Sequence, residues 1–128
     1  MWGRLMITLL NPNERREEAL SVGFEATDWI FQPAYQDYED AVSDWTTRLM
    51  VNGDRVVGTV YTRGPEVHVS VLPEWRKRWA TRGILKQVIP EPLAITRVTH
   101  GHEYMYDILH RLGFERRGDY FVRDGYGH

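Results

Sequence analysis

Cysteine is absent from the 128 residues of this chain. Without a thiol the protein can form no disulfide, cannot use a cysteine nucleophile and cannot build a zinc site from thiolates. Such a composition fits a reducing compartment, so the sequence predicts a cytoplasmic protein.

Long hydrophobic runs are missing as well. The longest apolar run near the start extends from Leu5 to Leu10, follows Arg4 and precedes no small-residue cleavage site. A secretory signal needs such a cleavage site, and a membrane-spanning helix needs about 20 consecutive apolar residues. We therefore expect neither a signal peptide nor a membrane span, and no membrane partner.

The chain has no large excess of charge of either sign. Its formal net charge is -2 at pH 7 and its isoelectric point is about 6.2. Nucleic acids and anionic membranes attract broadly basic surfaces, so nucleic acid is not an expected partner. Any anion site must come from a local cluster of cations.

The sequence does have the composition of one folded domain. Hydrophobic residues make up 42% of the 128 positions and charged residues 27%. A chain of this length can bury roughly two-thirds of its unfolded surface in a single core. We expect one domain over residues 1–128, with a monomer and a homodimer both left open.

The first third predicts one strand and two helical segments. Met6 to Leu10 is strand-like, and the charged stretch from Glu14 to Ser21 predicts a helix that ends at Gly23. The segment 28–42 predicts a loop with a short helix, whose one face carries Tyr35, Tyr38 and Val42.

The middle of the chain predicts a hairpin and a third strand. Two strand-like runs, 45–51 and 55–62, flank Asn52-Gly53-Asp54, a turn sequence that accepts positive φ. The run from Glu66 to Val71 then alternates three valines with Glu66, His68 and Ser70. We expect one face of this strand to be buried and the other to carry chemically active groups.

The last third predicts two helices and three strands. After Pro73, residues 74–82 lead into an amphipathic helix that Pro90 and Pro92 end, and a strand follows over 93–99. The helix expected from His102 to Leu112 has a core stripe and ends at Gly113, which suits a left-handed conformation. Strands over 114–117 and 119–123 surround Gly118, and the tail from Asp124 to His128 is expected to fray. The stripe of the second helix consists of Met105, Ile108, Leu109 and Leu112.

Three stretches carry a resemblance to a known family: the hairpin with its valine-rich strand, residues 71–81, and the ending Leu109-His110-Arg111-Leu112-Gly113-Phe114. Together they cover about residues 45–123, and they resemble the GNAT superfamily of N-acetyltransferases. The likeness extends to short members of that family, many encoded by bacteriophages. It implies an α/β (α+β) fold, with a mixed, twisted central sheet of six to seven strands flanked by helices. It also implies acetyl-coenzyme A as co-substrate.

The most diagnostic stretch is Val71-Leu72-Pro73-Glu74-Trp75-Arg76-Lys77-Arg78-Trp79-Ala80-Thr81. In the family it reads Val-x-Pro-x-x-Arg/Gln-x-x-Gly-x-Gly/Ala, and its amides with the next helix N-terminus hold the pyrophosphate of acetyl-coenzyme A. The resemblance therefore assigns cofactor binding to residues 76–81, namely Arg76, Lys77, Arg78, Trp79, Ala80 and Thr81. A solvated basic first turn is the alternative for the four cations Arg76, Lys77, Arg78 and Arg82.

Trp79 departs from the motif, because it stands where the family has glycine. Glycine lets the backbone approach a phosphate closely. Either the indole packs aside and Thr81 supplies a hydroxyl, or coenzyme A is not bound at all. The short members resembling this chain share an Arg-x-x-Trp version.

Acetyl transfer needs a base for the ammonium substrate and an acid for the leaving thiolate. Glu66 and His68, on the polar side of their strand, are the candidate bases. The alternative interpretations are that Glu66 is simply an exposed residue and that His68 is a packed residue of the sheet. The family's acid is a Tyr four residues before the helix-ending Gly, where this chain has Leu109. Tyr106 is the candidate substitute, and an ordinary helix residue is the alternative.

Three histidines, His100, His102 and His110, raise the question of a metal site. No Asp or Glu is spaced to complete a set of three or four ligands, so no metal is expected. His102 instead matches the Asn that often opens this helix in the family, where it helps to hold cofactor or backbone. A helix-cap histidine is the other interpretation.

The leading hypothesis is an acyl-coenzyme A dependent N-acetyltransferase that acts on an amine. The resemblance places the pantetheine arm against the backbone of Val69 and Val71, with the Val71 amide polarising the thioester. Five acids at positions 28, 37, 39, 40 and 44 favour an amine-bearing small molecule or a protein amine. The alternative is a GNAT-fold binding or structural protein that has lost coenzyme A, and a nucleic-acid modifier is disfavoured by the low isoelectric point.

Overall fold

The computed structural model describes residues 6–89, 91–98 and 102–124. The predictions for Pro90, Thr99 and His100 lie outside these residues, as does most of the tail. The elements in chain order are β1 (Ile7–Leu9), α1 (Arg16–Ala26), α2 (Tyr35–Ala41), β2 (Thr46–Asn52), β3 (Arg55–Arg63), β4 (Glu66–Val71), the 3-10 turn η1 (Pro73–Trp75), α3 (Arg82–Val88), β5 (Leu93–Thr96), α4 (Met105–Arg111), β6 (Glu115–Arg117) and β7 (Tyr120–Asp124).

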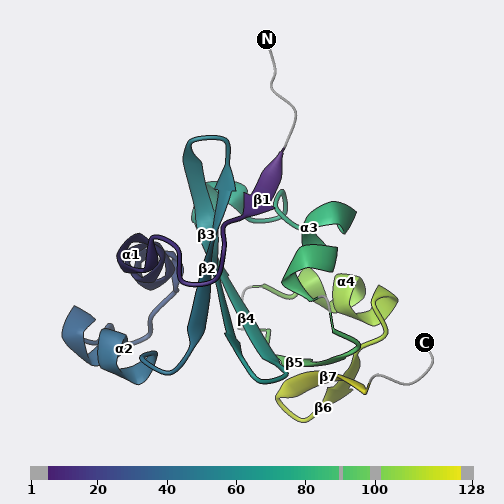
Figure 1. Ribbon diagram of the computed structural model, residues 1–128. Helices are drawn as coiled ribbons and strands as arrows, with labels where there is room; N and C mark the ends of the chain where they lie inside the picture. Colours follow the sequence, from purple (N-terminus) through teal and green to yellow (C-terminus); the bar gives the residue numbers. More distant parts are fainter. Residues whose placement is uncertain (1–5, 90, 99–101, 125–128) are drawn as a thin grey trace.

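The strands form one seven-stranded sheet in the order β1-β2-β3-β4-β5-β7-β6. The pair β4 and β5 is parallel, and the other neighbours are antiparallel. Helices α1 and α2 lie on one side of β1 to β4, and α3 and α4 lie on the other side (Figure 1). The predicted mixed sheet of six to seven strands flanked by helices is thus confirmed.

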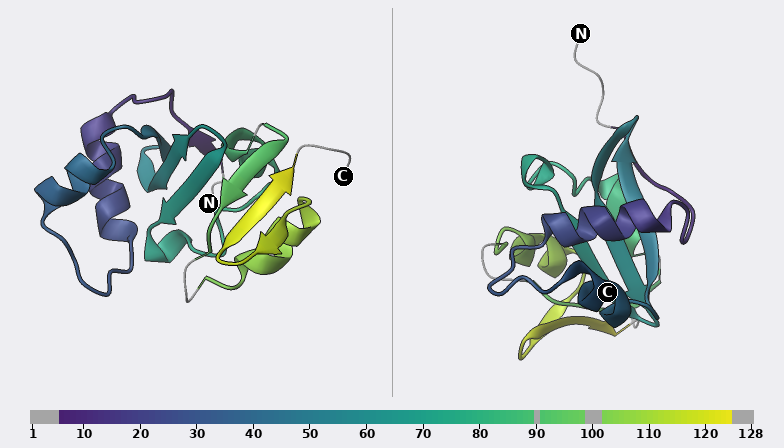
Figure 2. Two further views of the ribbon diagram at one scale, coloured as in Figure 1. Left: turned by 90° about the horizontal axis from the view of Figure 1, so that it is seen from below. Right: turned by 90° about the vertical axis from the view of Figure 1, so that its left-hand side faces the viewer.

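The sheet is bent at its centre. In Figures 1 and 2, β5, β7 and β6 turn out of the plane of β1 to β4, so that α3 and α4 lie in the angle between the two parts. This bend falls at the boundary between β4 and β5, which is where the chain leaves the sheet to form η1 and α3.

The central hairpin forms where the sequence Asn52-Gly53-Asp54 predicted its turn. Gly53 has φ of 64° between β2 and β3, a conformation that an Asn-Gly turn provides without strain. In β4 the predicted alternation is also present. Val67 and Val71 are buried, whereas Glu66, His68 and Ser70 are half-buried on the opposite face.

Helix α1 begins and ends later than predicted. It starts at Arg16 rather than Glu14, and it continues through Gly23 to Ala26. Gly23 does not stop the helix; a Cβ at this position would overlap the hydroxyl of Tyr61 on β3. The prediction was wrong because the glycine permits close packing between α1 and the sheet rather than chain reversal.

In the last third of the chain, the predicted elements are present but some of them begin or end at other residues. Strand β5 ends at Thr96 instead of Thr99, and α4 begins at Met105 instead of His102. Leu109 is the most buried member of the predicted stripe, with an exposed fraction of 2%. Gly113 ends the helix with φ of 91°, as predicted.

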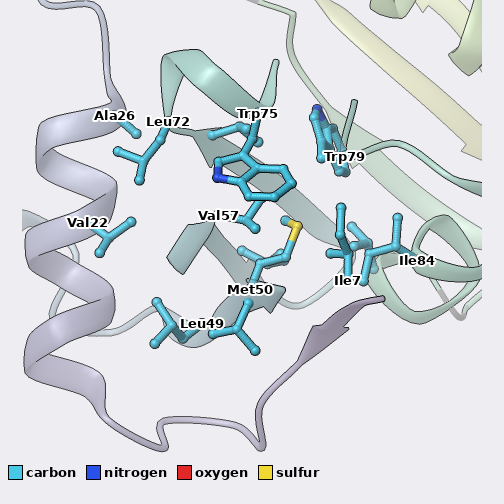
Figure 3. Packing of buried hydrophobic residues seen from close by; sticks show 14 of the residues in the cluster. Ile7, Val22, Ala26, Leu49, Met50, Val57, Leu72, Trp75, Trp79 and Ile84 are labelled. Atoms are coloured by element: carbon cyan, nitrogen blue, oxygen red, sulfur yellow. The ribbon is translucent and has the colours of Figure 1, made fainter. Parts of the chain in front are cut away.

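The main core lies around β2 and β3 and includes both tryptophans of the segment between β4 and α3. Trp75 and Trp79 are buried in it, and Figure 3 shows Trp79 on the side that holds Ile7 and Ile84. A smaller cluster joins Leu109 to Phe114 and Phe121. A third joins Leu20, Tyr38 and Tyr61 beneath α1 and α2.

Candidate functional site

The bend in the sheet leaves part of one edge of β4 without a strand beside it. Among the described residues, β4 and β5 are joined in register at Glu66 and Ile95, with the Ile95 amide donating to the Pro65 carbonyl at 2.9 Å. Peptide groups in a strand alternate in direction, so those of Val69 and Val71 point to the same side as that of Pro65. They therefore face the opening, where β5 has diverged.

A hollow of about 380 Å³, the central hollow, occupies this opening. Its walls come from the end of α1, from both faces of β4, from α3 and from the segments around β5 and α4. The polar and aromatic side chains of its lining include Thr27, Asp28, His68, Ser70, Trp79, His102 and Tyr104, and the valines of β4 complete this part of the wall. Elements far apart in the sequence thus meet at the free edge of β4.

Glu66 and His68, predicted as alternative bases, form a pair. His68 Nε2 lies 2.6 Å from Glu66 Oε2, and both side chains are about 30% exposed or less. A carboxylate only accepts, so His68 donates from Nε2 to Glu66, and Nδ1 is the ring nitrogen that can accept a proton. His68 also packs edge-on against Trp45, with ring centroids 5.4 Å apart.

Asp28 links two segments that border the central hollow. Its carboxylate oxygens lie 3.3 Å from the guanidinium of Arg76 and 3.3 Å from His102 Nε2. Burial opposes ionisation of Asp28, but the hydrogen bond with His102 and the charge of Arg76 outweigh it. The pKa of Asp28 therefore lies below its ordinary value of 3.8.

Arg76 is held inside the protein rather than extended to solvent. Besides Asp28, its guanidinium donates to the carbonyl oxygens of Val71 at 3.2 Å and Ala26 at 3.0 Å. Lys77 Nζ lies 5.9 Å from the centre of the Tyr104 ring, and the Arg78 guanidinium lies 4.9 Å from that of Trp75. Lys77 and Arg78 therefore keep charge available at the surface of this loop.

Most amides of the loop have partners within it. The amides of Arg78 and Trp79 donate to the Trp75 carbonyl, and that of Thr81 donates to the Trp79 carbonyl. The Thr81 hydroxyl accepts from the Ile84 amide at 3.3 Å and caps α3. Residues 78–81 are the end of the stretch whose amides the resemblance assigns to the pyrophosphate, and of these four amides only that of Ala80 has no backbone acceptor among the described residues.

Trp79 is turned into the core. Its side chain is 3% exposed and packs in the main core, while Nε1 donates to the Tyr104 hydroxyl at 3.3 Å. The indole thus follows the first of the two predicted alternatives, in which the ring packs aside. The Thr81 hydroxyl caps α3 as an acceptor, which leaves its proton available for donation.

Tyr106 and Tyr104 differ in where they lie. The Tyr106 ring packs against Phe121 with centroids 5.3 Å apart and lies under the Arg116 guanidinium, outside the lining of the central hollow. Tyr104, which the sequence patterns did not indicate, lines the hollow. Its hydroxyl accepts the indole N–H, so its own proton can be donated elsewhere. Its place just before the apolar stripe was the available signal.

His102 lies at the wall of the central hollow and pairs with Asp28. It precedes α4 by three residues and does not cap it; Tyr104 is the cap residue. Within the described ranges, no group of three or more His, Asp or Glu is arranged to hold a metal ion. No helix in those ranges is long and apolar enough to cross a membrane.

Sequence comparisons give no match, neither to a protein-family model nor to a curated protein. Solved structures do match. The ribosomal-protein-S18-alanine N-acetyltransferase of Escherichia coli aligns over 96% of this chain and 97% of its own, with 12% identity and a TM-score of 0.63. A GNAT-family protein from Desulfovibrio desulfuricans aligns over 91% and 95%, with 12% identity and a TM-score of 0.57. The chain therefore has the GNAT fold.

Proposed function

We propose that the protein is an acyl-coenzyme A dependent N-acetyltransferase that transfers an acetyl group to an amine. The observation that carries this proposal is the free edge of β4 at the central hollow, where the amide and carbonyl of Val69 and the amide of Val71 can bind an extended arm as an added strand would. The shared fold of two acetyltransferase-type structures supports it.

The residues around the opening fit acetyl-coenzyme A as substrate. The apolar walls and the free β4 edge suit the pantetheine arm, and the Ala80 amide with Lys77 and Arg78 suits the pyrophosphate. A neighbouring groove of about 570 Å³ between α3 and α4 includes Arg82, Lys86 and Arg111 in its lining. Arg76 serves this arrangement indirectly, because its bonds to Asp28 and two carbonyls hold the loop in place.

Three protein groups take part in the transfer: the His68 side chain, the Val71 amide and the Tyr104 hydroxyl. His68, oriented by Glu66, takes a proton from the substrate ammonium and so frees the nitrogen lone pair for attack. The Val71 amide, which faces the opening, donates to the thioester oxygen as negative charge develops on it. Tyr104 supplies a proton to the departing sulfur, and its O–H is available because the hydroxyl oxygen accepts from Trp79.

A non-catalytic binding protein is the second candidate. The observation that favours it is the loop at 78–81, where three of the amides expected for pyrophosphate are engaged within the loop and an indole replaces the motif glycine. In that case the fold would remain while the coenzyme A site would be lost.

An assay of thiol release separates the two candidates. Because the chain has no cysteine, a thiol reagent reports only coenzyme A released from acetyl-coenzyme A. We expect amine-dependent release that His68→Asn lowers at least 100-fold and Glu66→Gln lowers less, since Glu66 acts through the imidazole. Glu115→Gln, an exposed acid paired with Arg117, is the matched control and should retain full activity. No thiol release with any primary amine, together with no binding of acetyl-coenzyme A, would favour the binding protein.

A further inference from the structure

A second hollow meets the central hollow on the side of α1 and α2. It has a volume of about 230 Å³ and shares Thr27, His68 and Ser70 with the central hollow, so the two hollows adjoin at the polar face of β4. Its remaining walls are Tyr38, Val42, Trp45 and Tyr61. We call it the aromatic recess.

The walls of the aromatic recess are fixed before any ligand enters. The hydroxyls of Tyr38 and Tyr61 bond to each other, and their rings meet edge to face at 90° with centroids 6.5 Å apart. Arg16 donates to the Val42 carbonyl at 3.1 Å and to the Trp45 carbonyl at 2.8 Å. A rigid cavity loses little freedom on binding and selects ligands by shape.

The size and lining of the aromatic recess limit what it can hold. Its volume is below the ~300–1,000 Å³ of sites for drug-sized ligands, so it fits one ring or a short chain. Burial raises the pKa of both Tyr38 and Tyr61, which keeps their phenols neutral. Aromatic walls favour an aromatic guest, because rings at offset or edge-on angles attract beyond simple apolar burial.

The segment that lines the aromatic recess is acidic, and two arginines, Arg16 and Arg63, also contact its walls. Residues 35–47 contain four acids and no lysine or arginine. One of these acids, Asp44, pairs with Arg63 at 3.1 Å, while Glu66 holds His68 at the junction of the two hollows. Because Arg16 is bonded to two carbonyls and Arg63 to Asp44, the remaining acids favour an ammonium over a carboxylate on the ligand.

We propose that the acceptor is an arylalkylamine, a primary amine on a short arm from one aromatic ring; this rests on the proposed acetyltransferase function. The ring occupies the aromatic recess and the nitrogen reaches His68. A bond forms between that nitrogen and the acetyl carbon while the carbon–sulfur bond breaks. The ammonium gives up two protons: one passes through His68 to water, and the other replaces the proton that Tyr104 gives to the sulfur, so that amide and free thiol result.

The test compares small amines by kcat/KM at saturating acetyl-coenzyme A. We expect kcat/KM for phenethylamine to exceed the values for n-butylamine and phenylalanine by at least about tenfold. The reason is that n-butylamine lacks the ring and phenylalanine adds a carboxylate. Equal values for the three amines, or a higher value for a peptide N-terminus than for phenethylamine, would overturn the proposal. If the acceptor is a peptide, it would contact Ile30 and Phe31, whose side chains follow α1 and are 91% and 89% exposed.

Two variants at the half-buried Val42 act on the aromatic recess alone. Val42→Phe fills the cavity, so the Michaelis constant for phenethylamine should rise at least about tenfold while that for acetyl-coenzyme A is unchanged. Val42→Ala is the control, because it removes volume from the wall and leaves room for the ring. An unaltered Michaelis constant for the amine in a folded Val42→Phe variant would contradict the assigned place of the ring.

Direct binding keeps this proposal distinct from the acetyltransferase proposal. Calorimetric titration with phenethylamine needs no turnover, and we expect binding that Val42→Phe weakens at least about tenfold. If acetyl-coenzyme A neither binds nor reacts, the proposed function fails, yet Val42-dependent binding of the amine still supports the aromatic recess as its site. Absence of binding and of turnover with phenethylamine overturns the inference, even where acetyl-coenzyme A binds.

Discussion

Asp28 joins three segments that the chain keeps far apart. It follows α1, and its carboxylate contacts Arg76 before α3 and His102 before α4. A group with a lowered pKa in the folded state stabilises the fold above its ordinary pKa, and this contribution is lost as the pH falls through the folded value. The link between α1 and the loop is therefore present at neutral pH and weakens below about pH 3.8.

The first prediction concerns this titration. NMR of the side-chain carboxyl should give Asp28 a pKa below 3.8, and Arg76→Gln should move that pKa upward by removing a charge and a hydrogen bond. Lys77→Gln is the matched control, because Lys77 lies beside Tyr104 and should leave the titration of Asp28 unchanged. An Asp28 titration that is the same in both variants would contradict the link.

The second prediction compares two helical glycines. Gly23→Ala should lower the free energy of unfolding by about 1–3 kcal/mol, because the added methyl group overlaps the Tyr61 hydroxyl. Gly83→Ala in α3 meets nothing within 4 Å and should instead stabilise by about 0.5–1 kcal/mol. Urea denaturation of both variants measures the difference, and a destabilised Gly83→Ala with an unaffected Gly23→Ala would refute the packing argument.

At the scale of elements, two tyrosines near the start of α4 lie in different surroundings. Tyr104, at its start, lines the central hollow, whereas Tyr106 packs against Phe121. Tyr104→Phe should therefore lower kcat about tenfold to 100-fold by removing the proton donor, and should cost about 1 kcal/mol of stability as Trp79 loses its acceptor. Tyr106→Phe should leave kcat unchanged within about twofold. The reverse order of effects would return the acid role to Tyr106.

Local sequence patterns predicted the elements better than their ends. Gly53 and Gly113 act as the turn and cap chemistry requires, because a positive φ is a local property of the chain. Gly23 was assigned wrongly as a helix stop, since its role depends on Tyr61, a residue on another element. The start of α4 was placed three residues too early: the helix begins at Met105, and the His102 side chain contacts Asp28 ahead of it.

At the scale of the whole molecule, the opening of the sheet creates the candidate site. The alternation in β4 was enough to predict that Glu66 and His68 share a polar face. Their mutual hydrogen bond, the link from Arg76 to Asp28 and the lining role of Tyr104 depend on contacts between distant segments. Such contacts leave no periodic signal, so the sequence could not specify them.

The central claim is that the free edge of β4 binds the acyl-coenzyme A arm, and an NMR titration of amide-labelled protein with acetyl-coenzyme A tests it most directly. We predict saturable shifts of the Val69 and Val71 amides, whose peptide groups face the opening, with Ala80 also responding at the loop. Unchanged Val69 and Val71 signals at millimolar acetyl-coenzyme A would contradict the account.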